Sequence, residues 1–478
     1  MKNILFVASE CVPFIKTGGL ADVVGSLPKY VNKEEFDVRV MLPQYIALPE
    51  SYKAQMKYLT HFYMDLAWRN QYVGVFQLDF DGITFYFIDN EYYFAGSTPY
   101  GNIYEDIEKF AFFSKAALSA LPLLKFKPDV IHCHDWQTGL LPVYLKDKFH
   151  EGDFYKEINT VFTIHNLKFQ GIWDMKTVKD ITGLSEYYFT PDKLEAYGNA
   201  NYLKGGIVYS DFVTTVSDTY ANEIKTPFYG EGLDGLINAR SNSLEGIVNG
   251  IDYEEYNPET DSLIFHNYNL LNFRKEKIKN KRALQQELGL ENNDKAFMIG
   301  IVSRLTDQKG FDLIDYCIED ICAEDVQLVI LGTGEEKYEN LFRHYQWKYP
   351  DRVSANIFYS NERAHKIYAS CDAFLMPSLF EPCGLSQLMS LRYGTVPIVR
   401  ETGGLKDTVE PYNEYDRTGT GFSFRNYNAH EMLSIINYAK KTFSTKKREW
   451  NKIIDRGMAK DFSWKNSAIK YESLYNRL

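Results

Sequence analysis

A lysine beside a pair of glycines is the first feature of the sequence whose residue types suit a ligand. Lys16, Gly18 and Gly19 follow the apolar run Ile4–Ala8, which is typical of a buried strand. Ligands of doubly wound domains bind beyond the carboxyl ends of such strands. Paired glycines let the backbone approach a ligand closely, and a lysine there suits a phosphate or diphosphate. The segment is neither a Walker loop nor a G-x-G-x-x-G fingerprint, so an ordinary strand-to-helix turn remains the alternative.

Histidines and an acidic side chain follow two further apolar runs. His132, His134, Asp135 and Trp136 stand at the end of one run, and His165 stands at the end of the next. Strand alternation places His132 and His134 on one face. Zinc could bind there, but no third and fourth ligand is spaced nearby. Polar contacts to a ligand at this edge of a sheet are the favoured interpretation, with structural histidines as the alternative.

Two loops in the second half of the chain carry charges at strand ends. Arg304 and Lys309 share one loop, and together they suit a diphosphate because arginine offers a planar donor fork and lysine a point charge. Glu381 lies in the other loop, where it precedes a predicted helix. The backbone N–H groups at the beginning of that helix suit sugar hydroxyls or an anion; they belong to Cys383, Gly384 and Leu385. A solvated basic loop and a helix-capping glutamate are the alternatives.

The Gly-Gly turn has a second copy late in the sequence. Residues 17–24 match residues 402–409 at six of eight positions. The second copy contains Thr402, Gly403 and Gly404 ahead of a helix-like run, and helix N-termini attract anions. We expect one such loop in each of two domains, facing each other across a cleft; two ordinary turns are the alternative.

The elements that must position these residues alternate between strands and helices. Several apolar runs are apolar on both faces, which is typical of parallel strands covered by helices. Helical patterns between them, such as Glu105–Leu124 and Lys275–Leu288, indicate βα repetition. Antiparallel hairpin material is expected as an insertion within Phe62–Ile88. The predicted strands are Ile4–Ala8, Val38–Leu42, Thr84–Ile88, Val130–His134, Thr160–Ile164, Phe212–Val216, Phe297–Ser303, Gln327–Leu331, Ala373–Met376 and Val396–Val399.

The predicted strands fall into two groups, which indicates an α/β fold with two doubly wound, Rossmann-like domains. A long polar stretch containing Asn249-Gly250 and Asn257-Pro258 separates the groups, as suits an interdomain crossing. We expect the first domain to span residues 1–245 plus 463–478 and the second to span residues 246–462. The last segment joins the first domain in this scheme because its apolar spacing indicates a helix that needs a partner surface.

Composition and charge limit the class of protein. The 478 residues suggest about two to four domains, and the net charge of −11 argues against a nucleic-acid partner. None of the six cysteines forms a C-x-x-C pair, so a zinc site has little support, and the low cysteine count for this length fits a reducing compartment. The apolar run at residues 4–8 is shorter than a signal peptide requires and is interpreted as a buried strand, and no stretch approaches the ~20 apolar residues of a spanning helix. The sequence therefore predicts a cytoplasmic protein without a membrane partner.

Taken together, the motifs resemble those of bacterial glycogen synthases and plant starch synthases, which are retaining glucosyltransferases of GT-B architecture. The resemblance implies transfer of glucose from ADP-glucose to the non-reducing 4-OH of an α-1,4-glucan primer, without a cofactor or metal. It covers residues 1–478 and rests on Lys16-Thr17-Gly18-Gly19-Leu20, His134-Asp135-Trp136, Thr163-Ile164-His165-Asn166, Asn249-Gly250-Ile251-Asp252, Arg304, Gln308-Lys309-Gly310, Glu381-Pro382-Cys383-Gly384-Leu385 and Thr402-Gly403-Gly404-Leu405.

The resemblance also implies roles for residues of the first domain. Lys16 would be catalytic and, with the backbone of Gly18 and Gly19, would face the diphosphate and the sugar. His165 would contact the transferred glucose near the reacting centre. Asp135 and Trp136 would lie on the acceptor side.

For the second domain, the resemblance implies the donor site. Arg304 and Lys309 would neutralise the leaving diphosphate, and Glu381 would hold sugar hydroxyls. Tyr359 matches an aromatic residue on which the family stacks adenine. Further donor contacts would come from the backbone segments Cys383-Gly384-Leu385 and Thr402-Gly403-Gly404.

Several alternatives stay open at this point. Many retaining GT-B transferases carry a second glutamate where this chain has Met389, so ribose binding lacks a named carboxylate. The donor could be UDP-glucose, or the chain could be a phosphorylase, although no pyridoxal site is evident. It could also be an inactive sensor of a nucleotide-sugar. The oligomeric state is not indicated.

Overall fold

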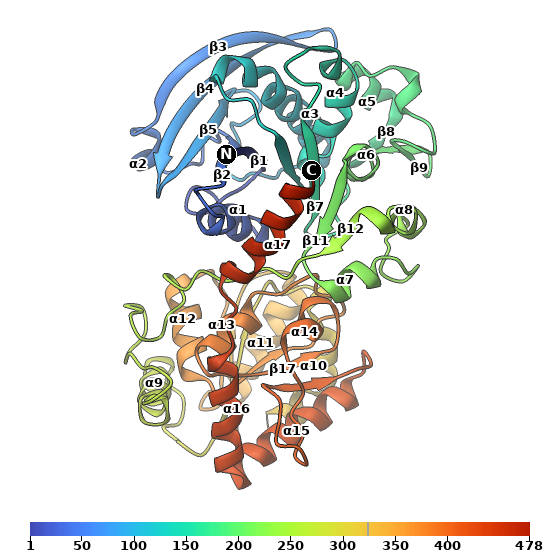
Figure 1. Ribbon diagram of the computed structural model, residues 1–478. Helices are drawn as coiled ribbons and strands as arrows, with labels where there is room; N and C mark the ends of the chain where they lie inside the picture. The colour runs from blue at the N-terminus through green and yellow to red at the C-terminus, as the bar shows by residue number, and fades with distance from the viewer. Residues whose placement is uncertain (323–324) are drawn as a thin grey trace. The chain divides into compact units, whose positions relative to one another are not determined.

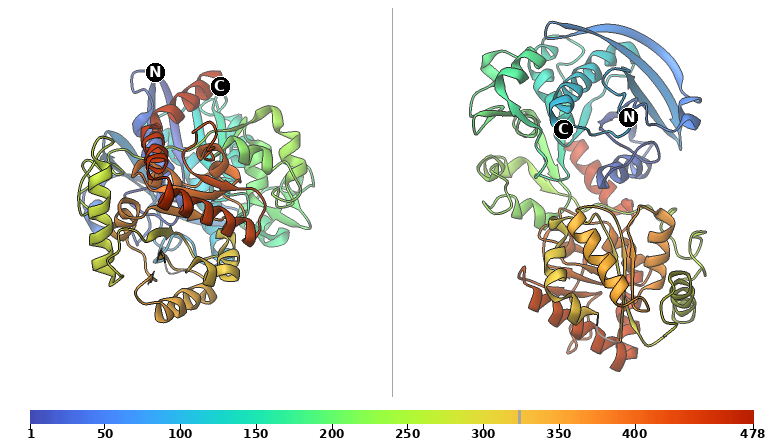
Figure 2. Two further views of the ribbon diagram at one scale, coloured as in Figure 1. Left: turned by 90° about the horizontal axis from the view of Figure 1, so that it is seen from below. Right: turned by 180° about the vertical axis from the view of Figure 1, so that it is seen from behind.

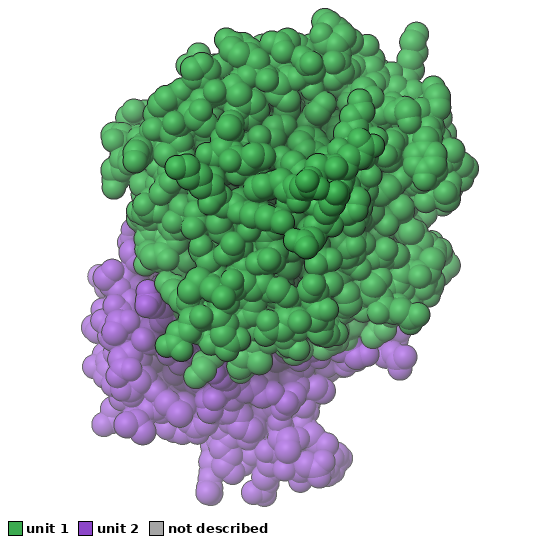
Figure 3. All heavy atoms as spheres, turned by 45° about the horizontal axis from the view of Figure 1, so that its top comes forward, with its two compact units in different colours: residues 1–249, 464–478 green, residues 250–463 purple. Residues whose placement is uncertain are grey.

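The computed structural model describes residues 1–322 and 325–478. The chain forms two compact units, coloured separately in Figure 3. Unit 1 comprises residues 1–249 with 464–478, and unit 2 comprises residues 250–463. Within the described residues, no helix has the length and apolar character needed to cross a membrane.

Unit 1 is built on a nine-stranded sheet in the order β12-β11-β7-β6-β1-β2-β5-β4-β3. The strands from β12 to β5 pair in parallel, whereas β5, β4 and β3 pair antiparallel. The predicted antiparallel hairpin is present: β3 and β4 are inserted in the chain between the parallel partners β2 and β5, and they extend the edge of the main sheet. The strands are β1 (Lys2–Val7), β2 (Phe36–Pro43), β3 (Lys57–Leu66), β4 (Arg69–Phe80), β5 (Ile83–Asp89), β6 (Val130–His134), β7 (Asn159–Ile164), β11 (Phe212–Thr215) and β12 (Leu244–Gly246).

Helices cover this sheet, and a small second sheet β8-β10-β9 lies in the same unit. The small sheet contains β8 (Ile172–Asp174), β9 (Glu195–Ala196) and β10 (Asn199–Asn201). The helices are α1 (Gly19–Tyr30), α2 (Glu50–Lys53), α3 (Ile103–Ala120), α4 (Leu140–Lys146), α5 (Met175–Thr182), α6 (Tyr202–Tyr209), α7 (Asp218–Glu223), α8 (Asp234–Ala239) and α17 (Trp464–Arg477).

Two of these helices show how local chemistry sets the boundaries. Helix α3 begins after Asn102, whose side chain accepts a hydrogen bond from the N–H of Glu105, as an N-cap does. It ends earlier than predicted, and a 3-10 turn with Pro122 follows, because proline has no N–H for the helical ladder. The C-terminal helix α17 packs beside α1, which lies near the N-terminus of the sequence (Figures 1 and 2).

Unit 2 is a six-stranded, all-parallel sheet in the order β15-β14-β13-β16-β17-β18. All six residues of β14 are buried, as expected for a strand covered on both faces. The strands are β13 (Phe297–Val302), β14 (Val326–Leu331), β15 (Val353–Asn356), β16 (Ala373–Met376), β17 (Val396–Arg400) and β18 (Phe422–Phe424). The helices are α9 (Phe273–Leu288), α10 (Phe311–Ile321), α11 (Glu336–Lys348), α12 (Asn361–Ser370), α13 (Ser386–Arg392), α14 (Gly403–Thr408), α15 (Ala429–Thr445) and α16 (Lys447–Ala459).

Candidate functional sites of the two units

The Lys-Gly-Gly turn of unit 1 is held by a buried carboxylate that the sequence analysis missed. Glu10 follows β1, and its Oε2 accepts hydrogen bonds from the N–H of Thr17, from the Thr17 hydroxyl at 2.7 Å and from the N–H of Gly18 at 3.3 Å. The Tyr100 hydroxyl donates to Oε1 at 3.1 Å. Burial raises the pKa of Glu10. The one available signal was an acidic residue placed shortly after a buried strand.

Gly18 is a glycine whose lack of a side chain the fold does not require. A Cβ at Gly18 would find no described atom nearer than 3.8 Å, and its backbone is extended. At Gly25, within α1, a Cβ would lie 2.4 Å from the side chain of Val12. Gly18 therefore leaves open space at the beginning of α1. Lys16 stands beside it and pairs with Asp22 at 2.7 Å.

Asp135 fixes the backbone that carries His165. It follows β6 with a positive φ of 56°, and its Oδ1 accepts a hydrogen bond of 2.7 Å from the N–H of His165 after β7. Burial raises the pKa of Asp135 to about 7, against the lowering effect of the backbone N–H groups of His165 and Asn166. The structure thus brings two predicted site residues into contact. Trp136 lies next to them but is only 6% exposed and packs edge-on against Phe110.

His165 presents a neutral ring at this edge of the sheet. Its side chain is half-buried, and burial lowers its pKa to about 3. Its Nε2 lies 3.0 Å from Nδ1 of His134. Both ring nitrogens of His132 bond hydroxyl groups instead. In the part of the chain that the structure describes, no group of three His, Cys, Asp or Glu side chains is arranged to hold a metal ion.

In unit 2, Lys309 and Glu381, two of the three predicted charged residues, form an ion pair. The Nζ atom of Lys309 lies 2.6 Å from Oε2 of Glu381, and Ser378 donates to the same oxygen at 3.1 Å. A Cβ at Gly310 would lie 2.1 Å from the carbonyl oxygen of Pro377. This close approach of the loop after β13 to the loop after β16 is what brings Lys309 to Glu381.

The second Gly-Gly pair packs on the loop of Glu381. A Cβ at Gly403 would lie 1.9 Å from the carbonyl oxygen of Glu381, and one at Gly404 would lie 2.1 Å from that of Cys383. Thr402 is the N-cap residue of α14 and is fully buried. Both copies of the repeat therefore lead into a helix, as predicted. The glycines of the second copy are required by packing, whereas Gly18 of the first copy is not.

The segment after Glu381 has the backbone of a helix start. Gly384 has a φ of +71°, and Leu385 precedes α13. The N–H groups of Gly384 and Leu385 donate to no acceptor among residues 1–322 and 325–478. Arg400, which the sequence analysis did not single out, supports the same loop by donating to the carbonyl oxygen of Leu379 at 2.6 Å.

Two further predicted residues of unit 2 are open to solvent. The side chain of Arg304 is exposed and forms no ion pair with a described residue. Tyr359 is 81% exposed and lies between β15 and α12. An unpaired guanidinium and an exposed ring are both available to a ligand.

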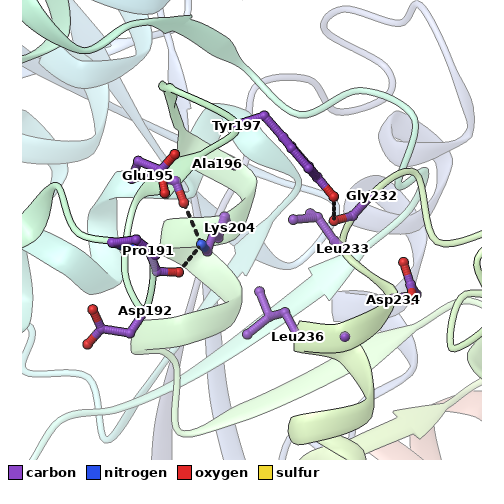
Figure 4. A pocket seen from close by; sticks show the side chains of 11 residues that line it. Pro191, Asp192, Glu195, Ala196, Tyr197, Lys204, Gly232, Leu233, Asp234 and Leu236 are labelled. Atoms are coloured by element: carbon purple, nitrogen blue, oxygen red, sulfur yellow. Dashed lines mark hydrogen bonds between the residues drawn. The ribbon is translucent and has the colours of Figure 1, made fainter.

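A cavity of about 500 Å³ lies elsewhere in unit 1, between β9 and α8 (Figure 4). The Nζ atom of Lys204 donates to the carbonyl oxygens of Pro191 and Glu195, and the Tyr197 hydroxyl donates to that of Gly232 at 3.1 Å. None of the predicted site residues lines this cavity.

Two family models match the chain, one in each unit. Residues 3–239 match the starch synthase catalytic domain, and residues 284–452 match the glycosyl transferases group 1 model. Together with the two Rossmann-like sheets, one wholly and the other mainly parallel, these matches define a glycosyltransferase of the GT-B fold. The predicted fold class is therefore confirmed.

Full-length similarity narrows this class to a family. The chain is 74% identical to a glycogen synthase of Lachnoclostridium phytofermentans and 73% identical to one of Lachnospira eligens, with each pair aligned over 100% of both chains. The catalytic domain of starch synthase IV from Arabidopsis thaliana, solved bound to ADP and acarbose, superposes with a TM-score of 0.92 at 32% identity, over 100% of this chain and 99% of that one. The chain belongs to the glycogen synthase family.

Proposed function

We propose that this chain transfers glucose from ADP-glucose to the non-reducing 4-OH of an α-1,4-glucan primer, with retention at the anomeric carbon. The observation that carries the proposal is the full-length similarity to a starch synthase catalytic domain that was solved with ADP and acarbose. The proposed site of action is the bacterial cytoplasm. All six cysteines are buried free thiols, which fits a reducing compartment.

Unit 2 would bind the donor. The exposed Arg304 and the ammonium of Lys309 provide two cations for the diphosphate. Once a diphosphate competes for Lys309, the Glu381 carboxylate is left to accept hydrogen bonds from sugar hydroxyls. The N–H groups of Gly384 and Leu385 provide further donors. Tyr359 would stack on the adenine.

Unit 1 would bind the acceptor and the reacting glucose. His165 and Asp135 form one hydrogen-bonded group, and Lys16 stands by the open backbone at Gly18. These residues come from the carboxyl ends of β1, β6 and β7, where doubly wound sheets bind ligands.

The proposed chemistry is electrostatic. Glycosyl transfer passes through an oxocarbenium-like centre while negative charge builds on the departing diphosphate. Cations already fixed on the enzyme stabilise that charge where it develops. Retaining hydrolases use a carboxylate nucleophile instead. We infer a substitution on one face of the sugar, in which an oxygen of the leaving diphosphate accepts the proton of the acceptor hydroxyl.

A transfer assay with radiolabelled donors tests this function. We expect label from ADP-glucose to enter a glycogen primer and to be released as maltose by β-amylase, which attacks α-1,4 linkages. Labelling from UDP-glucose alone would overturn the donor assignment. Release of glucose 1-phosphate from glycogen and phosphate would indicate a phosphorylase, and no transfer at all would indicate an inactive sensor.

A further inference from the structure

Three histidines of unit 1 form a column that begins at the C-terminal helix. The Nδ1 atom of His132 lies 2.8 Å from the hydroxyl of Tyr475 in α17, and its Nε2 lies 2.6 Å from Oγ1 of Thr163. The ring of His132 stacks on that of His134, with centroids 4.2 Å apart and planes 27° apart. Nδ1 of His134 then lies 3.0 Å from Nε2 of His165.

The two inner histidines differ in how their nitrogens are satisfied. Both nitrogens of His132 have hydroxyl partners, so hydroxyl rotation can serve either tautomer. Nε2 of His134 is buried and has no hydrogen-bond partner. The rings of Phe6 and His132 pack against it. His134 therefore has a single polar contact for its ring, and that contact is His165.

This arrangement discriminates between the two tautomers of His134. Burial keeps the ring neutral, because it lowers the pKa of His134 well below its usual value. A neutral imidazole has one N–H donor and one acceptor nitrogen. A proton on Nε2 would be a buried N–H donor without an acceptor, which costs the desolvation of that group, and it would leave the ring without a proton to donate from Nδ1. A proton on Nδ1 is instead donated to His165.

We propose that His134 is a positioning residue that sets the tautomer of His165: Nδ1–H of His134 donates to Nε2 of His165, so that His165 carries its own proton on Nδ1. Among residues 1–322 and 325–478, Nδ1 of His165 has no hydrogen-bond partner. The proton therefore stands on the nitrogen that is free to meet a ligand. His165 then acts as a neutral hydrogen-bond donor to an oxygen atom of the substrate.

This inference rests on the proposed function for the identity of that substrate, but the tautomer itself does not. In the reaction proposed above, the oxygen would be a hydroxyl of the transferred glucose. Loss of the His134 contact would let the proton of His165 move to Nε2, which turns the donor into an acceptor. Metal-bound histidines offer a comparable case: removing the partner that orients such a ring lowers activity by about 10–100-fold.

The direct test is ¹⁵N NMR of the full chain with labelled histidine. The protonated and unprotonated nitrogens of a neutral imidazole have distinct shifts, and the His165 signals are identified by their loss in His165→Gln. We expect wild-type His165 to carry its proton on Nδ1. A proton on Nε2 would overturn the proposal whether or not the chain transfers glucose. Conversely, an Nδ1–H signal without ADP-glucose activity would contradict the proposed function and leave the tautomer assignment standing.

Two substitutions of His134 separate the hydrogen bond from the packing. His134→Leu fills the space without a donor, and we expect turnover to fall about 10–100-fold while the KM for ADP-glucose stays nearly constant. His134→Asn keeps an N–H at the position of Nδ1, and we expect it to retain most of the turnover and the wild-type tautomer. Equal losses in both variants, with the tautomer of His165 unchanged, would show that His134 has only a packing role.

Tyr475→Phe is the matched control at the far end of the column. It removes the hydroxyl bonded to His132 but leaves the contact between His134 and His165 intact. We expect the His165 tautomer and the turnover to match those of the wild type. A tautomer change in this variant would contradict the assignment of that role to His134. If His134→Leu does not fold, His134→Asn and the wild-type spectrum still decide the question.

Discussion

The two predicted cations of unit 2 differ in their surroundings. Lys309 is tied to the buried Glu381, whereas Arg304 is exposed and unpaired among the described residues. The residue types predicted both cations and the carboxylate, but not the ion pair between two of them. That pair depends on how two loops far apart in the sequence approach each other, and Gly310 permits that approach.

Arg304→Ala and Lys309→Ala should each lower turnover by roughly 10²–10³, the loss typical of a donor to a developing oxyanion. Steady-state transfer assays measure this effect. Only Lys309→Ala should also lower the melting temperature, because it leaves the Glu381 carboxylate buried without its partner. Lys348→Ala, which removes an exposed lysine paired with Glu319, is the control and should change neither quantity. Normal turnover in both site variants would contradict their assignment to the diphosphate.

The carboxyl of Asp135 should make unit 1 less stable as the pH rises. Its pKa is about 7 in the folded chain but ordinary in the unfolded one, so between these values the folded state holds the extra proton. Stability from this group is complete at low pH and declines by up to about 1.4 kcal/mol per pH unit as the pH approaches 7. Asp135→Asn should remove this decline. Denaturant unfolding at pH 5, 6, 7 and 8 measures the free energy of unfolding of each protein. If it changed with pH equally in the wild type and in Asp135→Asn, the raised pKa would be contradicted.

At the scale of elements, the sequence predicts the interior of both sheets and fails at their edges. All ten predicted strands overlap observed ones, because buried parallel strands are continuous apolar runs. In the two large sheets, the missed strands β12, β15 and β18 have three or four residues each and lie at sheet edges. The short strands β8, β9 and β10 of the small sheet were missed as well. Segments such as Val353–Asn356 mix polar and apolar residues, so only pairing with a neighbouring strand makes them extended.

The conformation of the turn between β1 and α1 should depend on the carboxylate of Glu10, which accepts hydrogen bonds from that turn. Glu10→Gln keeps the shape but loses the charge that accepts two backbone N–H groups and a hydroxyl. Hydrogen bonds to a charged group contribute about 1.5–3 kcal/mol each, so we expect kcat/KM for ADP-glucose to fall at least tenfold. Thr17→Val removes only the hydroxyl contact and should have a smaller effect. Equal activity of Glu10→Gln and the wild type would show that the turn keeps its form without the charge.

For the molecule as a whole, the proposal places the nucleotide on unit 2 and the acceptor on unit 1, with residues of both units contacting the diphosphate and the transferred glucose. The repeat at residues 17–24 and 402–409 suggests two equivalent loops, yet the structure shows different reasons for their glycines. Sequence identity alone could not reveal this difference, because it lies in what each backbone contacts. Gly18 has open space, whereas Gly403 and Gly404 are packed against the loop of Glu381.

The assignment of the nucleotide to unit 2 predicts that ADP affinity depends on residues of unit 2 and not on Asp135 of unit 1. Tyr359 is the exposed ring that would stack on adenine, and base stacking on an aromatic ring is worth about 1–3 kcal/mol. Tyr359→Ala should therefore weaken ADP binding and raise the KM for ADP-glucose by roughly 5–150-fold, with a smaller effect on kcat because the base is remote from the bond that breaks. Asp135→Asn, in unit 1, should leave ADP affinity unchanged in calorimetric titrations. If remote binding energy also drives the reacting groups together, kcat of Tyr359→Ala falls as well. Unchanged ADP affinity and kinetics in Tyr359→Ala would mean that the base does not stack on this ring. Weaker ADP binding in Asp135→Asn would contradict the placement of the nucleotide on unit 2 alone.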